Sequence, residues 1–227
     1  MIETKIPRVR DFEVSGDGTA PAWSRTPWLA MPRVSGAAPY ETRAKVVYST
    51  KGLYLLVDCT DRLLSCSHRR DNDDIFQDDV VEVFLWPDES QTLYFEYEIS
   101  PLNVELPILV ANHAGKFHGW LPWHYEGERK TRHATAVRGG PPEPGATVAG
   151  WTAEMFIPFA LFAGLGNTPP HPGAKWRANI CRIDYDDREH PSHWVWAKGT
   201  GTNLHAFRRF GVLEFGTAND ATVVAQD

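Results

Sequence analysis

Short segments in which apolar and polar side chains alternate dominate this sequence and constrain the fold more than any other feature. Residues 93–100, LYFEYEIS, carry an apolar side chain at every second position and place Glu96 and Glu98 on the opposite face. Residues 80–86, VVEVFLW, form a second apolar run that Pro87 ends. A period of two is typical of β-strands, so both segments are predicted strands.

Further segments of the same kind extend along the chain. They are 45–58, a hairpin turning at Lys51-Gly52, and the strands 150–158, 175–186, 193–198 and 207–215. Only residues 159–166, FALFAGLG, fit one or two helical turns. We therefore predict an all-β fold: an antiparallel, jelly-roll-like β-sandwich with one or two short helices. No interior linker divides the 227 residues, so one domain is expected over 1–227.

The composition argues against several classes of partner. The net charge is −6, whereas nucleic-acid binding draws on clustered Lys and Arg, so no nucleic-acid partner is expected. No apolar run reaches the length of a membrane span, and no signal peptide is visible. We expect a soluble monomer, cytoplasmic by default and secreted if a leader was removed. Three cysteines without a CxxC spacing encode no zinc ribbon.

The acidic stretch 71–90, DNDDIFQDDVVEVFLWPDES, superficially has the spacing of an EF-hand loop. That interpretation fails because the sixth position requires glycine and holds Phe76, and because a strand follows instead of a helix. Two interpretations remain: a looser calcium loop through Asp71, Asp73 or Asp74, and a solvated acidic turn. The sequence assigns no metal ligands.

Paired carboxylates raise the question of catalysis. Glu82 and Asp79 lie on opposite faces of their strand, and Glu96 and Glu98 share a face that the alternation predicts to be open to solvent. A carboxylate on an open face gains no raised pKa and makes a poor general acid. No nucleophile or phosphate-binding motif is present, so we expect a protein that is not an enzyme.

Nine Trp, eleven Phe and seven Tyr exceed what packing requires and favour a ligand platform. Trp120 and Trp123 lie between Gly119 and Gly127 in a predicted aromatic loop. This loop has two interpretations: a platform for a sugar, and a cover for one end of the sandwich.

Five segments, in order and spacing, resemble the family 9 carbohydrate-binding modules, including stand-alone family-9-like proteins. The segments are DDIFQDDVVEVFLWPDES, YFEYEIS, GWTAEMFIPFALF, PGAKWRANICRID and FGVLEF, and they extend over about residues 40–215. The resemblance implies a β-sandwich that binds sugars without hydrolysing them, commonly with structural calcium.

In members of the family, a terminal sugar lies between two tryptophans, and a glutamate, arginines and amide side chains hydrogen-bond its hydroxyls. Position by position, the first clamp residue falls on Phe76 and the glutamate on Glu82. At the position of one family arginine this chain has Glu98, and the position of a second arginine lies near His190. At the position of the second tryptophan this chain has Leu204 or His205. Glu98, His190 and the Leu204-His205 pair depart from the family pattern. Trp120 or Trp123 is a candidate for the missing aromatic ring.

These inferences predict non-catalytic binding of a sugar or short glycan through aromatic faces and carboxylates. Residues 78–86 should form a central strand with Glu82 on the ligand side. Asp78 and Asp79 should turn the chain and accept hydrogen bonds from nearby backbone N–H groups. Two alternatives stay open: a small glycan hydrolase or lyase using Glu82 or Glu98 with a histidine, and an interaction domain that has lost sugar binding.

Overall fold

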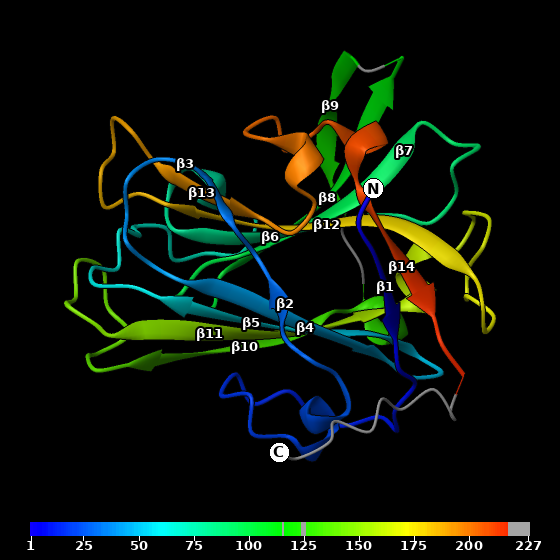
Figure 1. The fold of residues 1–227 in the computed structure, drawn as a ribbon, viewed down its shortest axis with the longest axis horizontal. Helices are drawn as coiled ribbons and strands as arrows, with labels where there is room; N and C mark the ends of the chain where they lie inside the picture. Colours follow the sequence, from blue (N-terminus) through cyan, green and yellow to red (C-terminus); the bar gives the residue numbers. More distant parts are fainter. Residues whose placement is uncertain (115, 124–125, 218–227) are drawn as a thin grey trace.

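The protein is an all-β sandwich of two sheets, as predicted (Figure 1). Its structure is a computed structural model that describes residues 1–114, 116–123 and 126–217. Fourteen strands and six 3-10 helices lie in these ranges. No helix in the described ranges is long and apolar enough to cross a membrane.

The larger sheet carries nine strands in the order β1-β14-β12-β6-β7-β8-β9, with β13 paired to β12 and β3 paired to β13. All of these pairs are antiparallel except β1 with β14. The bounds are β1 Glu3–Ile6, β3 Arg33–Ser35, β6 Val80–Trp86, β7 Leu93–Ile99, β8 Glu105–His113, β9 Lys116–Pro122, β12 Lys175–Asp184, β13 Ser192–Val195 and β14 Gly211–Phe215.

The smaller sheet is antiparallel and has the order β10-β11-β5-β4-β2. Its bounds are β2 Leu29–Ala30, β4 Thr42–Tyr48, β5 Gly52–Thr60, β10 Arg132–Arg138 and β11 Gly150–Pro158. The two sheets stack as separate layers in Figure 1. Apolar side chains between them form the main core, which includes Trp151 and Trp176.

Strand β6 lies in the middle of the larger sheet, between β7 and β12. Val81, Val83 and Leu85 belong to the core between the sheets. Because side chains alternate along a strand, Glu82 and Phe84 lie on the outer face. Phe84 belongs to a second apolar cluster that covers this outer face. Strand β6 is therefore buried on both faces, and the outer face of the larger sheet carries the candidate site.

Most predicted strands agree with the structure. The strand predicted at 207–215 was wrong in its first half, because Phe207–Arg209 form the 3-10 helix η6 and only Gly211–Phe215 form β14, and the strand predicted at 193–198 ends at Val195. The prediction also underestimated the number of short helices. Residues 159–166 form only the 3-10 helix η4, Phe159–Phe162. Five further short 3-10 helices lie in the described ranges, whereas the prediction of one or two short helices allowed at most one more. These are η1 Pro21–Arg25, η2 Ile75–Gln77, η3 Gly127–Arg129, η5 Lys198–Thr200 and η6 Phe207–Arg209. The segment expected to be an aromatic loop contains strand β9, so Trp120 lies in a strand, whereas residues 124 and 125 lie outside the described ranges.

Candidate functional site

A pocket of about 310 Å³ opens on the outer face of the larger sheet. Strands β6 and β7 supply its floor, and the β8–β9 hairpin supplies one wall. The segment that contains η5 and η6 lies beside that hairpin, above the sheet (Figure 1). The lining residues are Phe76, Glu82, Glu96, Glu98, Ile108, Phe117, Trp120, Ile183, Tyr185, His193, Thr202, Asn203, Leu204 and His205.

Three glutamates converge on the floor of this pocket. Glu82 of β6 lies directly opposite Glu98 of β7, and Glu96 lies two residues away on the same face of β7. One carboxylate oxygen from each residue lies within 4.8 Å of the other two. The side chains of Glu82, Glu96 and Glu98 are called the carboxylate trio below.

The trio is almost completely shielded from solvent, with Glu82, Glu96 and Glu98 only 3%, 3% and 1% exposed. The expectation that Glu96 and Glu98 lie on an open face was therefore wrong. Alternation along β7 correctly placed both on one face, but it could not reveal that η2, Tyr185 and the residues before η6 cover that face.

Few hydrogen bonds satisfy these carboxylates. A backbone N–H of Phe76 donates to Glu98. Nδ1 of His205 lies 3.7 Å from Oε2 of Glu96, but the same nitrogen is 2.7 Å from the hydroxyl of Tyr94. Within the described ranges, Oε2 of Glu96 and Oε2 of Glu98 are buried without any hydrogen-bond partner. Buried polar atoms are normally paired, so these two oxygens indicate that a ligand group belongs here.

Burial raises the pKa of each trio carboxyl, because removal from water disfavours the charged form. Burial raises the pKa of Glu82 to about 8. For Glu96, burial and then the charge of Glu82 raise the pKa well above its ordinary value. For Glu98, the causes are burial followed by the charges of Glu96, Glu82 and Asp74. The expectation of carboxyls with ordinary pKa values was wrong for the same reason as the expectation of exposure.

Aromatic rings stand around the trio. Phe76, Trp120 and Tyr185 are half-buried, and Phe117 is 46% exposed at the rim. The hydroxyl of Tyr185 donates to the backbone oxygen of Phe76 over 2.8 Å, which ties the end of β12 to η2. Half-buried rings beside hydrogen-bond acceptors offer both an apolar face and polar anchors to a ligand.

The structure brings together six of the eight residues that the sequence proposed for ligand binding. These are Phe76, Glu82, Glu98, Trp120, Leu204 and His205. Trp123 lies elsewhere: it packs against the core between the sheets, and its Nε1 donates to the backbone oxygen of Leu161 over 3.2 Å. Of the two interpretations of the aromatic segment, Trp120 fits the ligand platform and Trp123 fits the cover of the sandwich.

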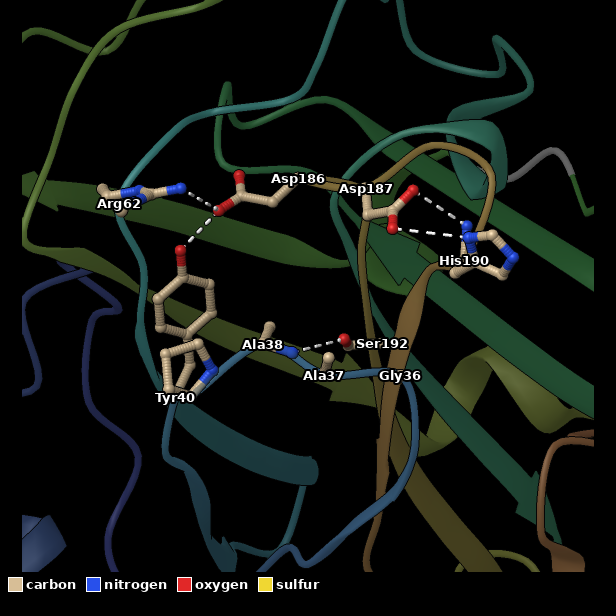
Figure 2. Close-up of a pocket in the computed structure, with 10 residues that line it drawn as sticks. Gly36, Ala37, Ala38, Tyr40, Arg62, Asp186, Asp187, His190 and Ser192 are labelled. Atoms are coloured by element: carbon tan, nitrogen blue, oxygen red, sulfur yellow. Dashed lines mark hydrogen bonds and ion pairs between the residues drawn. The ribbon is translucent and has the colours of Figure 1, made fainter.

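His190 lines a different pocket, of about 470 Å³, together with Tyr40, Arg62, Asp186 and Asp187. Figure 2 shows that its polar groups already pair with one another. Nδ1 of His190 lies 3.4 Å from Asp187, and the hydroxyl of Tyr40 donates to Asp186. This pocket and a third one of about 620 Å³ are larger than the pocket with the trio. Among the described residues that line these two pockets, Oδ1 of Asp186 is the one buried side-chain oxygen without a hydrogen-bond partner, whereas the trio has two such oxygens.

Sequence reasoning missed several residues of the site. Glu96 could have been included, because it shares a strand face with Glu98. Phe117, Tyr185, His193, Thr202 and Asn203 had no distinctive local pattern. They meet the trio only because β9, β12, β13 and the segment after η5 fold onto one face of the sheet.

A second acidic group consists of Asp61, Asp184 and Asp186, whose oxygens also lie within 4.8 Å of one another. Here the protein supplies the positive charge itself. Arg182 is fully buried and pairs with Asp61 at 3.0 Å and with Asp184 at 2.6 Å. Asp71, Asp73 and Asp74, the residues of the predicted acidic loop, belong to neither of the two metal-competent groups in the described residues.

The fold defines the class of two-sheet β-sandwich proteins, and the pocket on the face of one sheet is a candidate site for a small ligand. A family model for "Carbohydrate family 9 binding domain-like" matches residues 14–216. The chain belongs to this family, whose members are non-catalytic carbohydrate-binding modules. The hydrolase or lyase alternative is thereby excluded. A comparison with curated proteins gave no match.

Solved structures share the fold at low sequence identity. One is a Bacteroides uniformis ATCC 8492 protein described as a "putative carbohydrate-binding protein", with 16% identity, 94% of this chain and 99% of that chain covered, and a TM-score of 0.71. Another is a family 9 carbohydrate-binding module from Caldicellulosiruptor kristjanssonii in complex with cellotriose, with 16% identity, 99% and 100% covered, and a TM-score of 0.64. The complex of such a module with glucose has 16% identity, 96% and 97% covered, and the same TM-score.

Proposed function

We propose that the pocket above the carboxylate trio binds one or two sugar units of a glycan and releases them chemically unchanged. The observation that carries this proposal is the placement of half-buried Phe76 and Trp120 in the lining of a pocket whose floor is three buried carboxyls. A pyranose presents apolar C–H faces and a rim of hydroxyls, which matches such a combination of rings and acceptors.

The size of the pocket supports a short ligand. A volume of about 310 Å³ is at the lower end of the range for small-molecule sites, roughly 300–1,000 Å³. A terminal sugar or a disaccharide fits this volume better than an internal stretch of a long polysaccharide. The exposed side chains of Thr202 and Asn203 at the edge of the pocket add groups that can hydrogen-bond further hydroxyls.

The trio also bears on which sugars are accepted. An ionised carboxylate accepts hydrogen bonds from hydroxyls, whereas the arginine that the family resemblance implies at Glu98 would donate them. Another carboxylate brought by a uronic acid would face three acidic groups with no Lys or Arg among the described lining residues. We therefore propose neutral sugars as ligands and, while no cation occupies the trio, uronic acids as the class that the site rejects.

Titration calorimetry tests this proposal with glucose, cellobiose, xylobiose and glucuronic acid. Glucose and cellobiose are titrated first, because solved structures of similar modules are in complex with glucose and cellotriose. Phe76→Ala and Trp120→Ala should each weaken binding up to about tenfold, because an aromatic partner contributes roughly 0.5–1.5 kcal/mol beyond its buried area. Trp28→Ala is the matched control, since Trp28 is also half-buried but lies beside Arg43 and Lys45 of β4, in the smaller sheet.

Binding that survives both Phe76→Ala and Trp120→Ala at full strength would place the sugar elsewhere and contradict the proposal. A folded wild-type protein that binds none of a broad glycan array would favour the remaining alternative, an interaction domain that has lost sugar binding.

A further inference from the structure

The carboxylate trio has a feature that a sugar alone does not explain. Glu96 and Glu98 each keep an oxygen, Oε2, that is buried and has no hydrogen-bond partner in the described ranges. Each residue is at least nine-tenths buried, and both line the floor of the pocket together with Glu82. Two unpartnered acceptors beside a third carboxylate create a local demand for positive charge.

The protein does not meet this demand with its own side chains. No Lys or Arg is among the described residues that line the pocket. The one basic side chain of the described ranges within ion-pair distance of the trio is His205, 3.7 Å from Glu96, and Tyr94 shares its Nδ1. The contrast with Asp61 and Asp184 is direct, because Arg182 pairs with both of those carboxylates. The same fold therefore supplies a buried arginine to one acidic group, whereas no Lys or Arg of the described ranges lines the pocket of the other.

The geometry of the trio fits a small ion. Three ligand oxygens that all lie within 4.8 Å of one another can contact one central atom at the 2.3–2.6 Å typical of calcium. An all-oxygen donor set favours Ca²⁺, Mg²⁺ or Mn²⁺ over zinc or copper. Calcium accepts irregular arrangements of six to eight oxygens, whereas magnesium demands a near-ideal octahedron. Three glutamates on one sheet face provide an irregular, one-sided set of ligands.

We propose that Glu82, Glu96 and Glu98 bind one Ca²⁺ ion on the floor of the pocket. The carboxylates occupy one side of the ion, and its remaining coordination positions point into the pocket. Sugar hydroxyls can fill these positions, so calcium and sugar binding reinforce each other. The site itself stands on the trio alone, whereas its coupling to sugar rests on the function proposed above.

Calcium binding is measured on the chelator-treated full-length protein by calorimetry, with CaCl₂ as titrant and MgCl₂ for comparison. We expect one site with a Kd at or below about 10⁻³ M for calcium, within the range for protein calcium sites. Magnesium should bind more weakly. Glu96→Gln and Glu98→Gln should each weaken calcium binding at least tenfold, because each removes a charged ligand. The double variant Asp71→Asn, Asp73→Asn is the control for a calcium site in the acidic loop and should bind as the wild type does.

Several outcomes would overturn the inference. They are no saturable calcium binding at millimolar CaCl₂, undiminished binding in a folded Glu98→Gln variant, and loss of binding in the Asp71, Asp73 double variant instead. Stronger stabilisation by glucosamine than by calcium would assign the trio to an ammonium group and also contradict it. Circular dichroism establishes that each variant is folded, and terbium luminescence sensitised by Trp120 and displaced by calcium reports the position of the ion independently.

Sugar titrations in chelator and in calcium separate this inference from the proposed function. Sugar binding without any calcium binding overturns the calcium site alone. Calcium binding without binding of any glycan overturns the proposed function and leaves the calcium site in place.

Discussion

Glu82 on β6 and Glu98 on β7 lie directly opposite each other in an antiparallel pair, and both are buried. Like charges in directly opposed positions destabilise a sheet, and burial adds the cost of removing each charge from water. Nothing in the packing of the sandwich requires acidic residues here, since the core lies on the other face of both strands. We therefore attribute the pair to the proposed ligand binding and not to the stability of the fold.

The first prediction follows from this opposition. Glu98→Gln should raise the free energy of unfolding by about 0.2–1 kcal/mol in chelator at alkaline pH, because it removes one of two opposed carboxylates. Alkaline pH is needed because burial raises the pKa of Glu82 to about 8. The amide can still accept the hydrogen bond from the backbone N–H of Phe76 and can donate to Glu96. Urea unfolding of the wild type and the variant measures the difference. A variant less stable than the wild type in chelator would mean that Glu98 supports the fold.

The alternation of side chains was sufficient to predict the central strands. Val81, Val83 and Leu85 face the core because side chains alternate between the two faces of β6, and Glu82 lies on the other face. The same signal failed for β9, whose residues are exposed or half-buried on both faces. A strand at a sheet edge that projects from the sandwich has no core face, so its sequence need not alternate.

The site was only partly predictable for a related reason. Alternation assigns Glu96 and Glu98 to one face of β7 but contains no information about what covers that face. The cover includes His205, which is 111 residues from its partner Tyr94 in the sequence. A contact over such a separation depends on the path of the whole chain. The resemblance to a family supplied Phe76 and Glu82, and the structure was needed to show that Glu96 is buried in the lining of the same pocket.

Two neighbouring tryptophans should respond differently to substitution. Trp123→Ala should lower the free energy of unfolding by about 1–3 kcal/mol, because it removes core packing and the hydrogen bond to Leu161. Sugar affinity of the folded variant should not change, since Trp123 does not line the pocket. Trp120→Ala should show the reverse: weaker sugar binding and little loss of stability. Thermal unfolding and calorimetry on both variants test the pair, and equal effects of the two substitutions on affinity would contradict the assignment.

Arg182 should be one of the most sensitive positions for stability. Arg182→Met leaves Asp61 and Asp184 buried without their shared counter-charge, and breaking a buried ion pair in this way costs about 3–5 kcal/mol. Arg62→Met is the control, since this side chain is mostly exposed and lies 4.0 Å from Asp186. Its loss should cost less than about 1 kcal/mol. Urea unfolding at neutral pH measures both, and similar costs for the two variants would show that the buried pair does not stabilise the fold.

Asp78 turns the chain into β6 and should link stability to acidic pH. Its Oδ2 accepts hydrogen bonds from the backbone N–H groups of Ser67 and His68 and from the hydroxyl of Ser67. Burial opposes ionisation, but these hydrogen bonds prevail and lower the pKa of Asp78 below its ordinary value of 3.8. The ionised form is thus favoured by the folded state, and its contribution is complete above about pH 3.8 and is lost as the pH falls through the folded-state pKa.

Asp78→Asn should therefore lower the free energy of unfolding by about 1–3 kcal/mol at pH 7, since an amide cannot replace a carboxylate that accepts several hydrogen bonds. The difference from the wild type should shrink as the pH falls below 3.8, because the wild-type carboxyl is then protonated as well. Asp73→Asn is the matched control, because this residue lies in the preceding acidic loop. Its carboxylate forms an ion pair with the Arg70 side chain and accepts a hydrogen bond from the Arg70 backbone N–H. Urea unfolding across the acidic range measures the effect, and a difference that stays constant down to pH 3 would show that the charge of Asp78 is not what stabilises this turn.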